Sequence, residues 1–242
     1  MKGTILQPSY LPWIGYFDMI DISDIYVAFD DVQFSKKSWQ QRNFIKTQQG
    51  ALMLSVSIKR SKLTTSIKDI KTMDNKKILK NHWKAISLAY KKSPYFEKYK
   101  QLFENIYRKN YTYLRNFNID IIKTICEILG IKTKFIYSSD IMIKKDQNDN
   151  TTKKIIKLCK GAGITTLYDG FGASKILDSN VIDKSNIDFK FQDLIHPLYN
   201  QLHGKFISHM STIDLIFNEG PKSLDIIRQA RKFQNYKDLN NR

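Results

Sequence analysis

The 242-residue sequence predicts an α/β protein with a Rossmann-like parallel sheet and a basic helical insertion. Apolar segments at 2–6 and 25–29 flank a helical pattern at 14–23, and this compact βαβ arrangement requires parallel strands. Three helical patterns in a row then interrupt the alternation over residues 76–130. Strands and helices alternate again from residue 131 onward, so the helices are an insertion into one sheet-based domain.

The segment after the second strand is expected to form a hairpin, followed by the inserted helices. Apolar and polar residues alternate in 51–58 and 66–73, so these segments are predicted to be strands joined by a turn at 59–65. Amphipathic helices are predicted at 76–92, 94–108 and 111–129. Pro94 suits a first helical turn and Gly130 suits a C-terminal cap, which supports these boundaries.

Short alternating elements return after the inserted helices. Strands are predicted at 132–137, 164–168 and 187–191, and helical segments at 152–159, 172–177, 211–218 and 222–233. The polar run 144–152 is expected to be a mobile loop, and residues 234–242 are expected to be a polar tail.

Length and composition fit one folded domain spanning residues 1–242. Its α/β core is expected to comprise 1–75 plus 131–242, and its basic helical subdomain 76–130. Cys126 and Cys159 have no second cysteine pair at metal-ligand spacing, so we expect buried free thiols and no metal. The sequence shows neither an apolar run of membrane-spanning length nor a signal peptide, which predicts a cytoplasmic protein without a transmembrane segment.

Positive charge is concentrated in the middle of the chain. Residues 1–58, 59–160 and 161–242 carry net charges of 0, +16 and +1. One interpretation is a solvated surface, because 33 of the 40 basic residues are Lys, and Arg is the better phosphate ligand. The other is a surface for tRNA, other RNA or anionic lipid, since random drift in composition would not spare both ends.

The densest group of potential site residues follows the first strand, from Gln7 to Phe17. In a parallel α/β sheet, this junction between strand and helix is where ligands bind. Trp13 and Tyr16 offer flat rings for stacking on a base or sugar, and Gly15 would allow a ligand or another backbone to approach. The alternative is that these rings pack the helix on the sheet, which is the favoured interpretation only for Phe17.

A second polar group follows the second predicted strand and should lie beside the first. Asp30 and Asp31 are adjacent, so one carboxylate should face the cleft and the other should face away. A carboxylate there can bond sugar hydroxyls, bind a cation or take a proton from an amine, and Arg42 suits a phosphate or carboxylate. Gln33 and Asn43 add amide groups. The alternative is a polar turn that caps neighbouring backbone.

Histidines are the other candidates for a general base. His82 lies early in the predicted helix 76–92 and can exchange a proton at neutral pH, although a half-buried residue bonded to a carbonyl group is the alternative. His209, shortly before the predicted N-cap Ser211, is expected to order backbone. No His or Cys pair has metal-ligand spacing, and no Gly-x-Ser-x-Gly motif indicates a serine hydrolase.

Five segments together resemble the WbqC-like family: QPSYLPWIGYFDMI, DDVQF, SWQQRN, NHWKAISLAYKKSPYF and FISHMSTIDLIFNEG. Their order and spacing match over nearly the whole chain. The resemblance implies work on bacterial cell-surface polysaccharides such as O-antigen, beside nucleotide-sugar enzymes. The positions that match the family's motifs are Gln7, Tyr10, Pro12, Trp13, Gly15, Tyr16, Asp31, Gln33, Arg42, Asn43, His82, Tyr95, Tyr199, Ser211, Asp214 and Asn218. Where the family commonly has a small residue or Ser in a Tyr-x-Gly stretch, this chain has Tyr168-Asp169-Gly170, which leaves the role of that loop open.

A weaker resemblance concerns the chemistry. Nucleotidylyltransferase-like (HUP-like) folds hold ATP phosphates with a His-x-Gly-His motif after the first strand, and here Trp13-Ile14-Gly15-Tyr16 fills that spacing. Similar folds make acyl adenylates or take activated acyl groups from tRNA.

These resemblances imply an amide-forming acyl or aminoacyl transferase that acts on a nucleotide-linked amino sugar. The donor would be an acyl-CoA, an aminoacyl-tRNA, or an amino acid plus ATP. Trp13 or Tyr16 would stack on base or sugar, and Arg42 would hold a phosphate. Asp31 or His82 would deprotonate the amine. Two alternatives remain: an ATP-dependent adenylate-forming ligase, and a non-catalytic module that binds RNA or anionic lipid through its basic helices.

The last predicted site element is the helix 211–218. Its apolar residues can bury most of the surface, so Asp214 and Asn218, four residues apart, must share the remaining face. We expect this face to point into the same cleft as Gln7 and Asp31, where it would orient the substrate or the segment 30–43.

Overall fold

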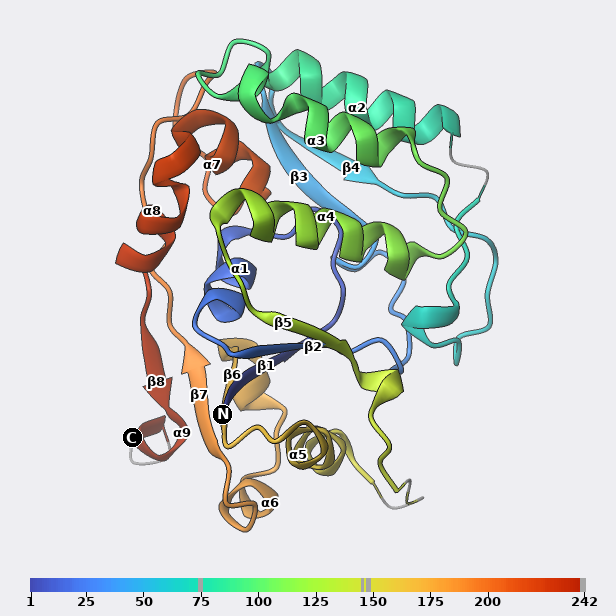
Figure 1. Cartoon of the computed structure of the whole chain (residues 1–242), viewed down its shortest axis with the longest axis vertical. Coiled ribbons are helices and arrows are strands. Elements are labelled where there is room, and N and C mark those ends of the chain that lie inside the picture. Colours follow the sequence, from blue (N-terminus) through green and yellow to red (C-terminus); the bar gives the residue numbers. More distant parts are fainter. Residues whose placement is uncertain (74–75, 145, 147–148, 240–242) are drawn as a thin grey trace.

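A six-stranded sheet forms the centre of the fold (Figure 1). The computed structural model describes residues 1–73, 76–144, 146 and 149–239. The strands of the sheet, in spatial order, are β5 (Lys134–Tyr137), β2 (Ile25–Ala28), β1 (Lys2–Leu6), β6 (Thr166–Gly170), β7 (Asp188–Gln192) and β8 (Phe233–Asn235). Each neighbouring pair is parallel except β7 with β8, which is antiparallel. The predicted α/β class and mostly parallel sheet are therefore confirmed.

Helices cover both faces of this sheet, which explains why the central strands are apolar on both sides. All four residues of β2 are buried: Tyr26 and Ala28 belong to one core, and Ile25 and Val27 to the other. The first core includes α1 (Ile14–Asp21), α4 (Leu114–Leu129), α7 (Thr212–Glu219) and α8 (Ser223–Gln229). The second includes α5 (Thr151–Ala162), α6 (Ser179–Asp183) and α9 (Tyr236–Leu239).

The chain between β2 and β5 builds a second layer above α4 (Figure 1). It contains the hairpin of β3 (Arg42–Thr47) and β4 (Gly50–Ser55), then α2 (Lys76–Tyr90) and α3 (Phe96–Arg108). In α3, Phe96, Tyr99 and Phe103 are buried at helical spacing and join the core shared with α4 and α7. The three predicted inserted helices are confirmed, each with one end as predicted and the other end two or three residues inside the predicted range.

The predicted hairpin is correct in one strand and wrong in the other: the strand expected at 51–58 corresponds to β4, but β4 pairs with the preceding β3 rather than with 66–73. β3 was not anticipated because its polar Asn43 and Lys46 hide the pattern, yet both side chains are buried. The expected second strand, 66–73, instead contains a 3₁₀ turn (Ile67–Asp69), since Ile67 and Ile70 are buried three residues apart rather than in alternation. In place of a continuous strand, residues of 66–73 form isolated bridges to other segments, such as the bridge between Ile58 and Thr72.

The C-terminal elements also differ from prediction. The helix expected at 222–233 ends at Gln229, and the residues expected as a tail form β8 and α9 up to Leu239. Three further short 3₁₀ helices, Ser138–Asp140, Phe171–Lys175 and Gly220–Lys222, join other elements. The mobile loop expected at 144–152 lies partly outside the described residues, and its end forms the first turn of α5. Cys126 and Cys159 are buried free thiols, as expected.

Candidate active site

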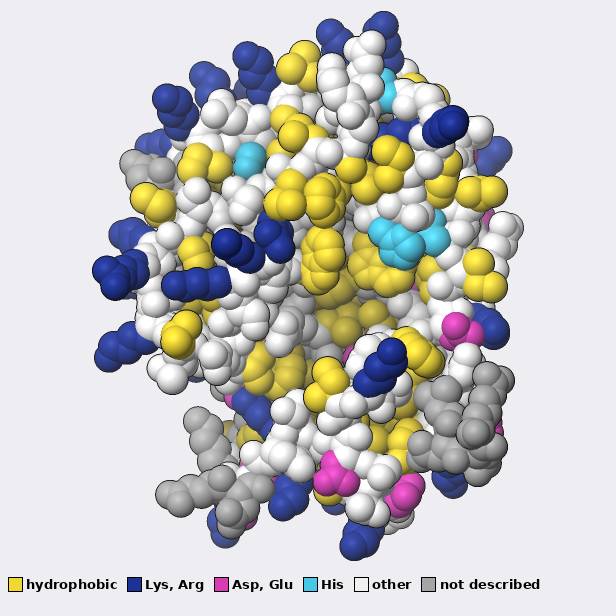
Figure 2. All heavy atoms as spheres, turned by 180° about the vertical axis from the view of Figure 1, so that it is seen from behind, with side chains coloured by type: hydrophobic (Ala, Val, Ile, Leu, Met, Phe, Trp, Pro, Cys, Tyr) yellow, Lys and Arg dark blue, Asp and Glu magenta, His cyan; other side chains and the backbone are white. Residues whose placement is uncertain are grey.

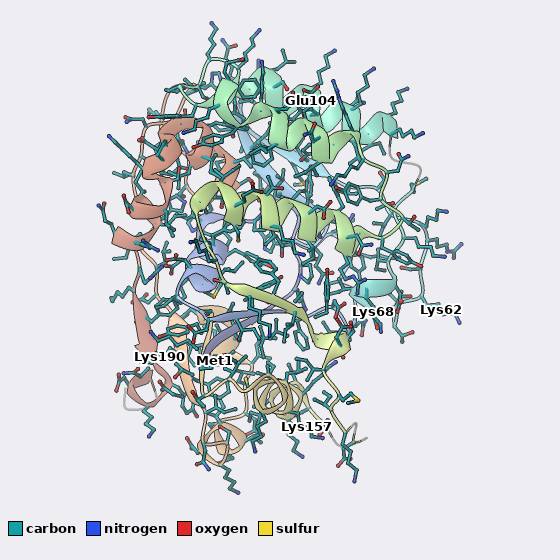
Figure 3. All side chains as sticks on the ribbon, in the orientation of Figure 1. Met1, Lys62, Lys68, Glu104, Lys157 and Lys190 are labelled. Atoms are coloured by element: carbon teal, nitrogen blue, oxygen red, sulfur yellow. The ribbon has the colours of Figure 1, made fainter. Side chains whose placement is uncertain are left out.

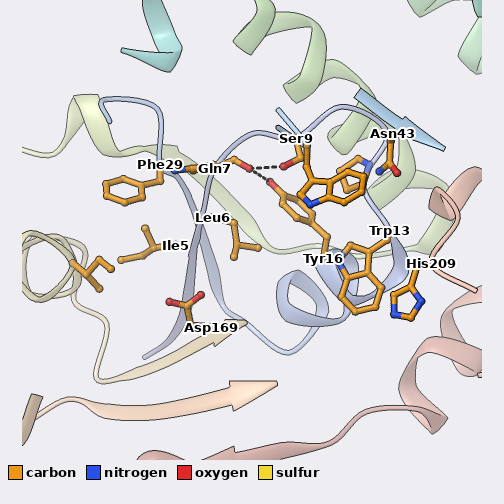
Figure 4. A pocket seen from close by; sticks show the side chains of 13 residues that line it. Ile5, Leu6, Gln7, Ser9, Trp13, Tyr16, Phe29, Asn43, Asp169 and His209 are labelled. Carbon is orange, nitrogen blue, oxygen red and sulfur yellow. Dashed lines mark hydrogen bonds between the residues drawn. The ribbon is translucent and has the colours of Figure 1, made fainter. Parts of the chain in front are cut away.

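A cavity of about 510 Å³ lies at the carboxyl ends of β1 and β6. The chain leaves β1 toward β2 on one side, whereas β6 leads to β7 on the other, so the segments after these adjacent strands diverge. Such a switch point is the usual ligand site of a parallel α/β sheet. Figure 2 shows this face of the molecule hollowed in its middle, with apolar side chains in the hollow and histidine beside it. The cavity is lined by Ile5, Leu6, Gln7, Ser9, Pro12, Trp13, Tyr16, Phe29, Trp39, Asn43, Ile155, Asp169 and His209 (Figure 4).

Hydrogen bonds from the amide side chains of two asparagines hold the backbone of the segment between β1 and α1 in place. Leu11 has a φ of 45°, a left-handed conformation that is unfavourable for a residue with a side chain. Asn43 Nδ2 donates a hydrogen bond to the Leu11 carbonyl at 2.7 Å, and Asn118 Nδ2 bonds the carbonyls of Pro8 and Gln40 at 3.0 and 2.7 Å. These bonds fix the backbone that presents Gln7 and Trp13 to the cavity.

Aromatic rings form one wall of the cavity. Trp13 stacks on His209, with ring centroids 5.3 Å apart and planes inclined by 27°. The Tyr16 hydroxyl donates to the Gln7 carbonyl at 3.1 Å, as Figure 4 shows. A Cβ at Gly15 would lie 2.3 Å from the Trp13 ring and 2.7 Å from Gln192 Oε1. The glycine therefore admits these two side chains, rather than the ligand or second backbone expected from the sequence.

Asp169 is the carboxylate of the site, and sequence reasoning did not select it. It follows the buried part of β6, beside Ile5 and Leu6 in Figure 4, and the Gly170 N–H donates to its Oδ1 at 2.7 Å. Burial raises the pKa of Asp169 to about 7, and the Gly170 bond opposes this only in part. Among the described lining residues it is the single carboxylate, and none is Lys or Arg. The available signal was a carboxylate at the end of a predicted strand, in the stretch where the family pattern differs.

His82, which was predicted to be catalytic, does not line the cavity. It is buried outside the cavity wall, and its Nδ1 lies 2.9 Å from the hydroxyl of the fully buried Tyr10. The Tyr10 hydroxyl also lies 2.8 Å from that of Tyr107, so these groups tie α2 and α3 to the segment after β1. Burial lowers the pKa of His82 to about 4, and the ring is therefore neutral at physiological pH.

Neither Asp30 nor Asp31 faces the cavity, although one of them was expected to do so. Asp30 is fully buried and binds Arg115 Nη1 at 2.6 Å. Asp31 binds Lys154 Nζ at 2.8 Å and accepts a hydrogen bond from Ser138 Oγ. Burial favours the neutral acid, but Lys154 and Ser138 outweigh it and hold the pKa of Asp31 below its usual value. These carboxylates join the ends of β2 and β5 to α4 and α5.

Asp214 and Asn218 are also turned away from the cavity. Asp214 Oδ2 accepts hydrogen bonds from the Tyr199 hydroxyl at 2.8 Å and Gln201 Nε2 at 2.7 Å. Asn218 Nδ2 donates to the backbone carbonyl of Asp214 at 2.7 Å. The expectation that this face points toward Gln7 therefore fails, because both side chains are buried and engaged with protein groups.

The structure thus brings together only part of the predicted set. Gln7, Trp13, Tyr16 and Asn43 line the cavity. Gln33 is exposed, Tyr95 packs its ring on Gly220, and Ser211 is the buried N-cap of α7. Arg42 is partly exposed at the start of β3, next to Asn43, with no ion pair within the described ranges.

Comparison with known proteins assigns the chain to a family. A model of the WbqC-like protein family matches residues 7–226. The chain belongs to the WbqC-like family. It is 31% identical over 234 residues to an uncharacterized protein of Mycobacterium tuberculosis, Rv1507c, covering 96% of this chain and 99% of that protein. No solved structure matches the chain significantly.

No described helix is both long enough and apolar enough to cross a membrane. In the same part of the chain, no cluster of three or more His, Cys, Asp or Glu side chains has the arrangement of a metal site.

Proposed function

We propose that this WbqC-like protein is a cytoplasmic transferase that forms an amide on an amino sugar carried by a nucleotide. The observation that carries the proposal is Asp169, a carboxyl group with a pKa of about 7 in an aromatic-walled cavity at the switch point of the sheet. A general base works best when its pKa lies near the working pH. Family membership supports a role in the synthesis of bacterial cell-surface polysaccharide, such as O-antigen of lipopolysaccharide.

The described lining residues fit an amine better than a phosphate. Asp169 offers an anionic partner, Trp13 and Trp39 offer ring faces, and none of these lining residues is Lys or Arg. A carboxylate beside aromatic rings attracts an ammonium group, and sugar rings stack on indole. The nucleotide phosphates would lie at the mouth, within reach of Arg42.

In the proposed reaction, the sugar ammonium group first releases one proton to solvent. The free amine then attacks the acyl carbonyl carbon while Asp169 takes a second proton from the nitrogen. The new carbon–nitrogen bond forms as the bond from that carbon to the donor's leaving group breaks. Asp169 then returns a proton to the leaving group. The donor is an acyl-CoA, an aminoacyl-tRNA or an acyl adenylate made from an amino acid and ATP. The last is the least supported, because Trp13 fills the space at Gly15 where similar folds hold phosphates.

The test combines dTDP- and UDP-linked amino sugars with each donor and measures the mass of the sugar product. We expect one pair to give an amide, and Asp169→Asn to slow its formation by about 10²- to 10⁴-fold. Asp183→Asn, at an exposed site on α6, is the matched control and should retain full activity. The proposal is wrong if no pair reacts, or if Asp169→Asn is as active as the control.

A further inference from the structure

The two segments beside the cavity mouth carry a large excess of positive charge. These segments, residues 35–42 and 56–71, contain eight Lys and Arg residues and one carboxylate, Asp69. They lie side by side, since the Phe34 N–H donates to the Thr65 carbonyl and the Val56 N–H to the Gln41 carbonyl, both within 2.9 Å. We refer to residues 35–42 and 56–71 together as the cationic surface.

Its charges are not neutralised within the described part of the chain. Lys36, Lys37, Lys59, Arg60 and Lys62 are exposed, and none of them forms an ion pair with another described residue. Residues 72–160 contain 20 Lys and Arg residues and eight Asp and Glu residues, and some of these form ion pairs within the described part of the chain. Ion pairs there join Lys100 to Glu97, Arg108 to Glu104, Lys109 to Asp120 and Lys157 to Asp149.

The higher ratio of basic to acidic residues, eight to one against 20 to eight, distinguishes the cationic surface from the rest of the basic region. Figure 2 shows Lys and Arg side chains beside and above the hollow, and Figure 3 shows Lys62 and Lys68 at one edge of the molecule. The first turns of α2, with Lys76, Lys77 and Lys80 all exposed, continue the surface along the chain. A row of unpaired cations of this kind fits a phosphodiester backbone.

Trp39 connects the cationic surface to the cavity. It lies between Lys37 and Arg42 in the sequence, lines the cavity, and leaves 58% of its surface exposed. Its backbone is held in place because the Tyr10 N–H donates to the Trp39 carbonyl at 2.9 Å. An exposed indole next to cations is the usual platform for an unpaired base.

We infer that the cationic surface binds the acceptor end of a charged tRNA, with its terminal base on Trp39 and its aminoacyl ester in the cavity. This inference rests on the proposed function and names its donor. The sugar amine attacks the ester carbonyl carbon, a carbon–nitrogen bond forms, and the ester bond to the terminal ribose oxygen breaks. Asp169 takes the proton from the amine and delivers it to that oxygen, so charge and protons balance.

Binding is tested with unfractionated bacterial tRNA, labelled with a fluorophore away from its 3′ end, by anisotropy over a range of salt concentrations. The test variant carries Lys59→Glu, Arg60→Glu and Lys62→Glu. The control variant carries Lys160→Glu, Lys184→Glu and Lys222→Glu, which change the net charge equally at exposed sites on or beside α5, α6 and α8. We expect at least a tenfold weaker affinity for the test variant than for the control. Its salt dependence should also be shallower, by about 0.7 to 0.9 in the logarithmic slope for each lost phosphate contact.

Trp39→Ala tests the position of the terminal base. Loss of one stacked base weakens binding by about 5- to 150-fold, and we expect this loss with intact tRNA but not with tRNA lacking its 3′-terminal CCA. Equal weakening of both tRNAs would contradict this placement.

Other outcomes overturn the inference and leave the proposed function standing. These are equal tRNA affinity of the test and control variants, no tRNA binding at about 50 mM salt, or binding of vesicles with anionic lipid in place of tRNA. Amide formation from an acyl-CoA by the test variant at the full rate would lead to the same conclusion. The converse result is also possible: the test variant alone loses tRNA binding, but no donor gives an amide. This result would contradict the proposed function and support tRNA binding by the cationic surface.

Discussion

Asp169 couples the stability of the protein to the reactivity of its cavity. An aspartate in water has a pKa near 3.9, so the unfolded chain carries this charge at neutral pH, whereas burial raises the folded-state pKa to about 7. Folding therefore takes up a proton between these two values. The stability that Asp169 contributes is complete below the unfolded pKa and is lost as the pH rises through about 7.

Asp169→Asn is accordingly expected to stabilise the protein at high pH while removing its activity. Its advantage in melting temperature over the natural sequence should grow from about pH 4 to about pH 7, reach a few degrees, and then stay constant. In the unmutated protein, kcat/KM for amide formation should rise through about pH 7 as Asp169 loses its proton. Calorimetry and rate measurements over this pH range check both outcomes. A melting-temperature difference that is the same at every pH would contradict the raised pKa.

Cavity residues could be predicted from the sequence only where their position in the sheet topology is enough to place them at the cavity. Trp13 and Tyr16 follow the first strand, and any parallel α/β sheet brings that junction to the ligand side. Asp31 and His82 looked equally suitable, but their roles depend on Lys154 and Tyr10, partners far away in the chain. Because such pairings are tertiary, residue type and spacing could not distinguish an ion-paired carboxylate from the free one at Asp169.

The segment 193–210, between β7 and α7, carries His209 to the cavity without any helix or strand of its own. The Gln201 side chain makes two hydrogen bonds across this segment. Gln201 Oε1 accepts from the Ile207 N–H at 2.9 Å, and Gln201 Nε2 donates to the Ile207 carbonyl at 3.0 Å. Asp214, fully buried on α7, accepts from both Gln201 and Tyr199. The polar pair on α7 that resembled a substrate contact is therefore the anchor of a cavity wall.

Asp214→Asn is expected to loosen this wall more than it disturbs the sheet. Hydrogen bonds to a buried charged group contribute about 1.5–3 kcal/mol each, and both Tyr199 and Gln201 would lose their anionic acceptor. Hydrogen exchange should therefore accelerate in 193–210 while β1 and β6 remain protected. Tyr199→Phe, which removes one of the two bonds, serves as the graded comparison and should give a smaller change in the same segment. Uniform acceleration across the sheet would instead mean that Asp214 supports the whole core.

The overall architecture was predictable wherever local pattern and burial agree. The βαβ start, the three inserted helices and the later alternation are all present, because continuous apolar strands and amphipathic helices follow directly from two-sided burial of a parallel sheet. The failures share one cause. β3 contains Lys46, which is buried despite its charge, and β8 is a three-residue edge strand defined by its pairing with β7. Neither feature is visible without the partner segments.

That edge strand also shows how the two ends of the chain depend on each other. Arg231, just before β8, binds Asp18 Oδ1 on α1 at 2.6 Å and also pairs with Asp21. Asp18 is fully buried and accepts a further bond from Gln192 Nε2 at 2.8 Å. Burial raises the pKa of Asp18 even though Arg231 and Gln192 oppose it. The last strand therefore holds the counter-charge of a carboxylate on the first helix.

Arg231→Ala is expected to destabilise the protein by about 3–5 kcal/mol near neutral pH, because it leaves the buried Asp18 carboxylate without its cation. The loss should shrink as the pH is lowered, since Asp18 then takes up a proton in the folded state. Arg228→Ala is the matched control: Arg228 binds the same Asp21 at 2.8 Å, but its side chain is 51% exposed. Because Arg228 is half exposed and Asp21 keeps Arg231 as a second cation, we expect this variant to lose only about 0–1 kcal/mol. Urea denaturation of both variants at two pH values measures the difference, and equal losses would mean that burial of Asp18 does not decide the strength of this link.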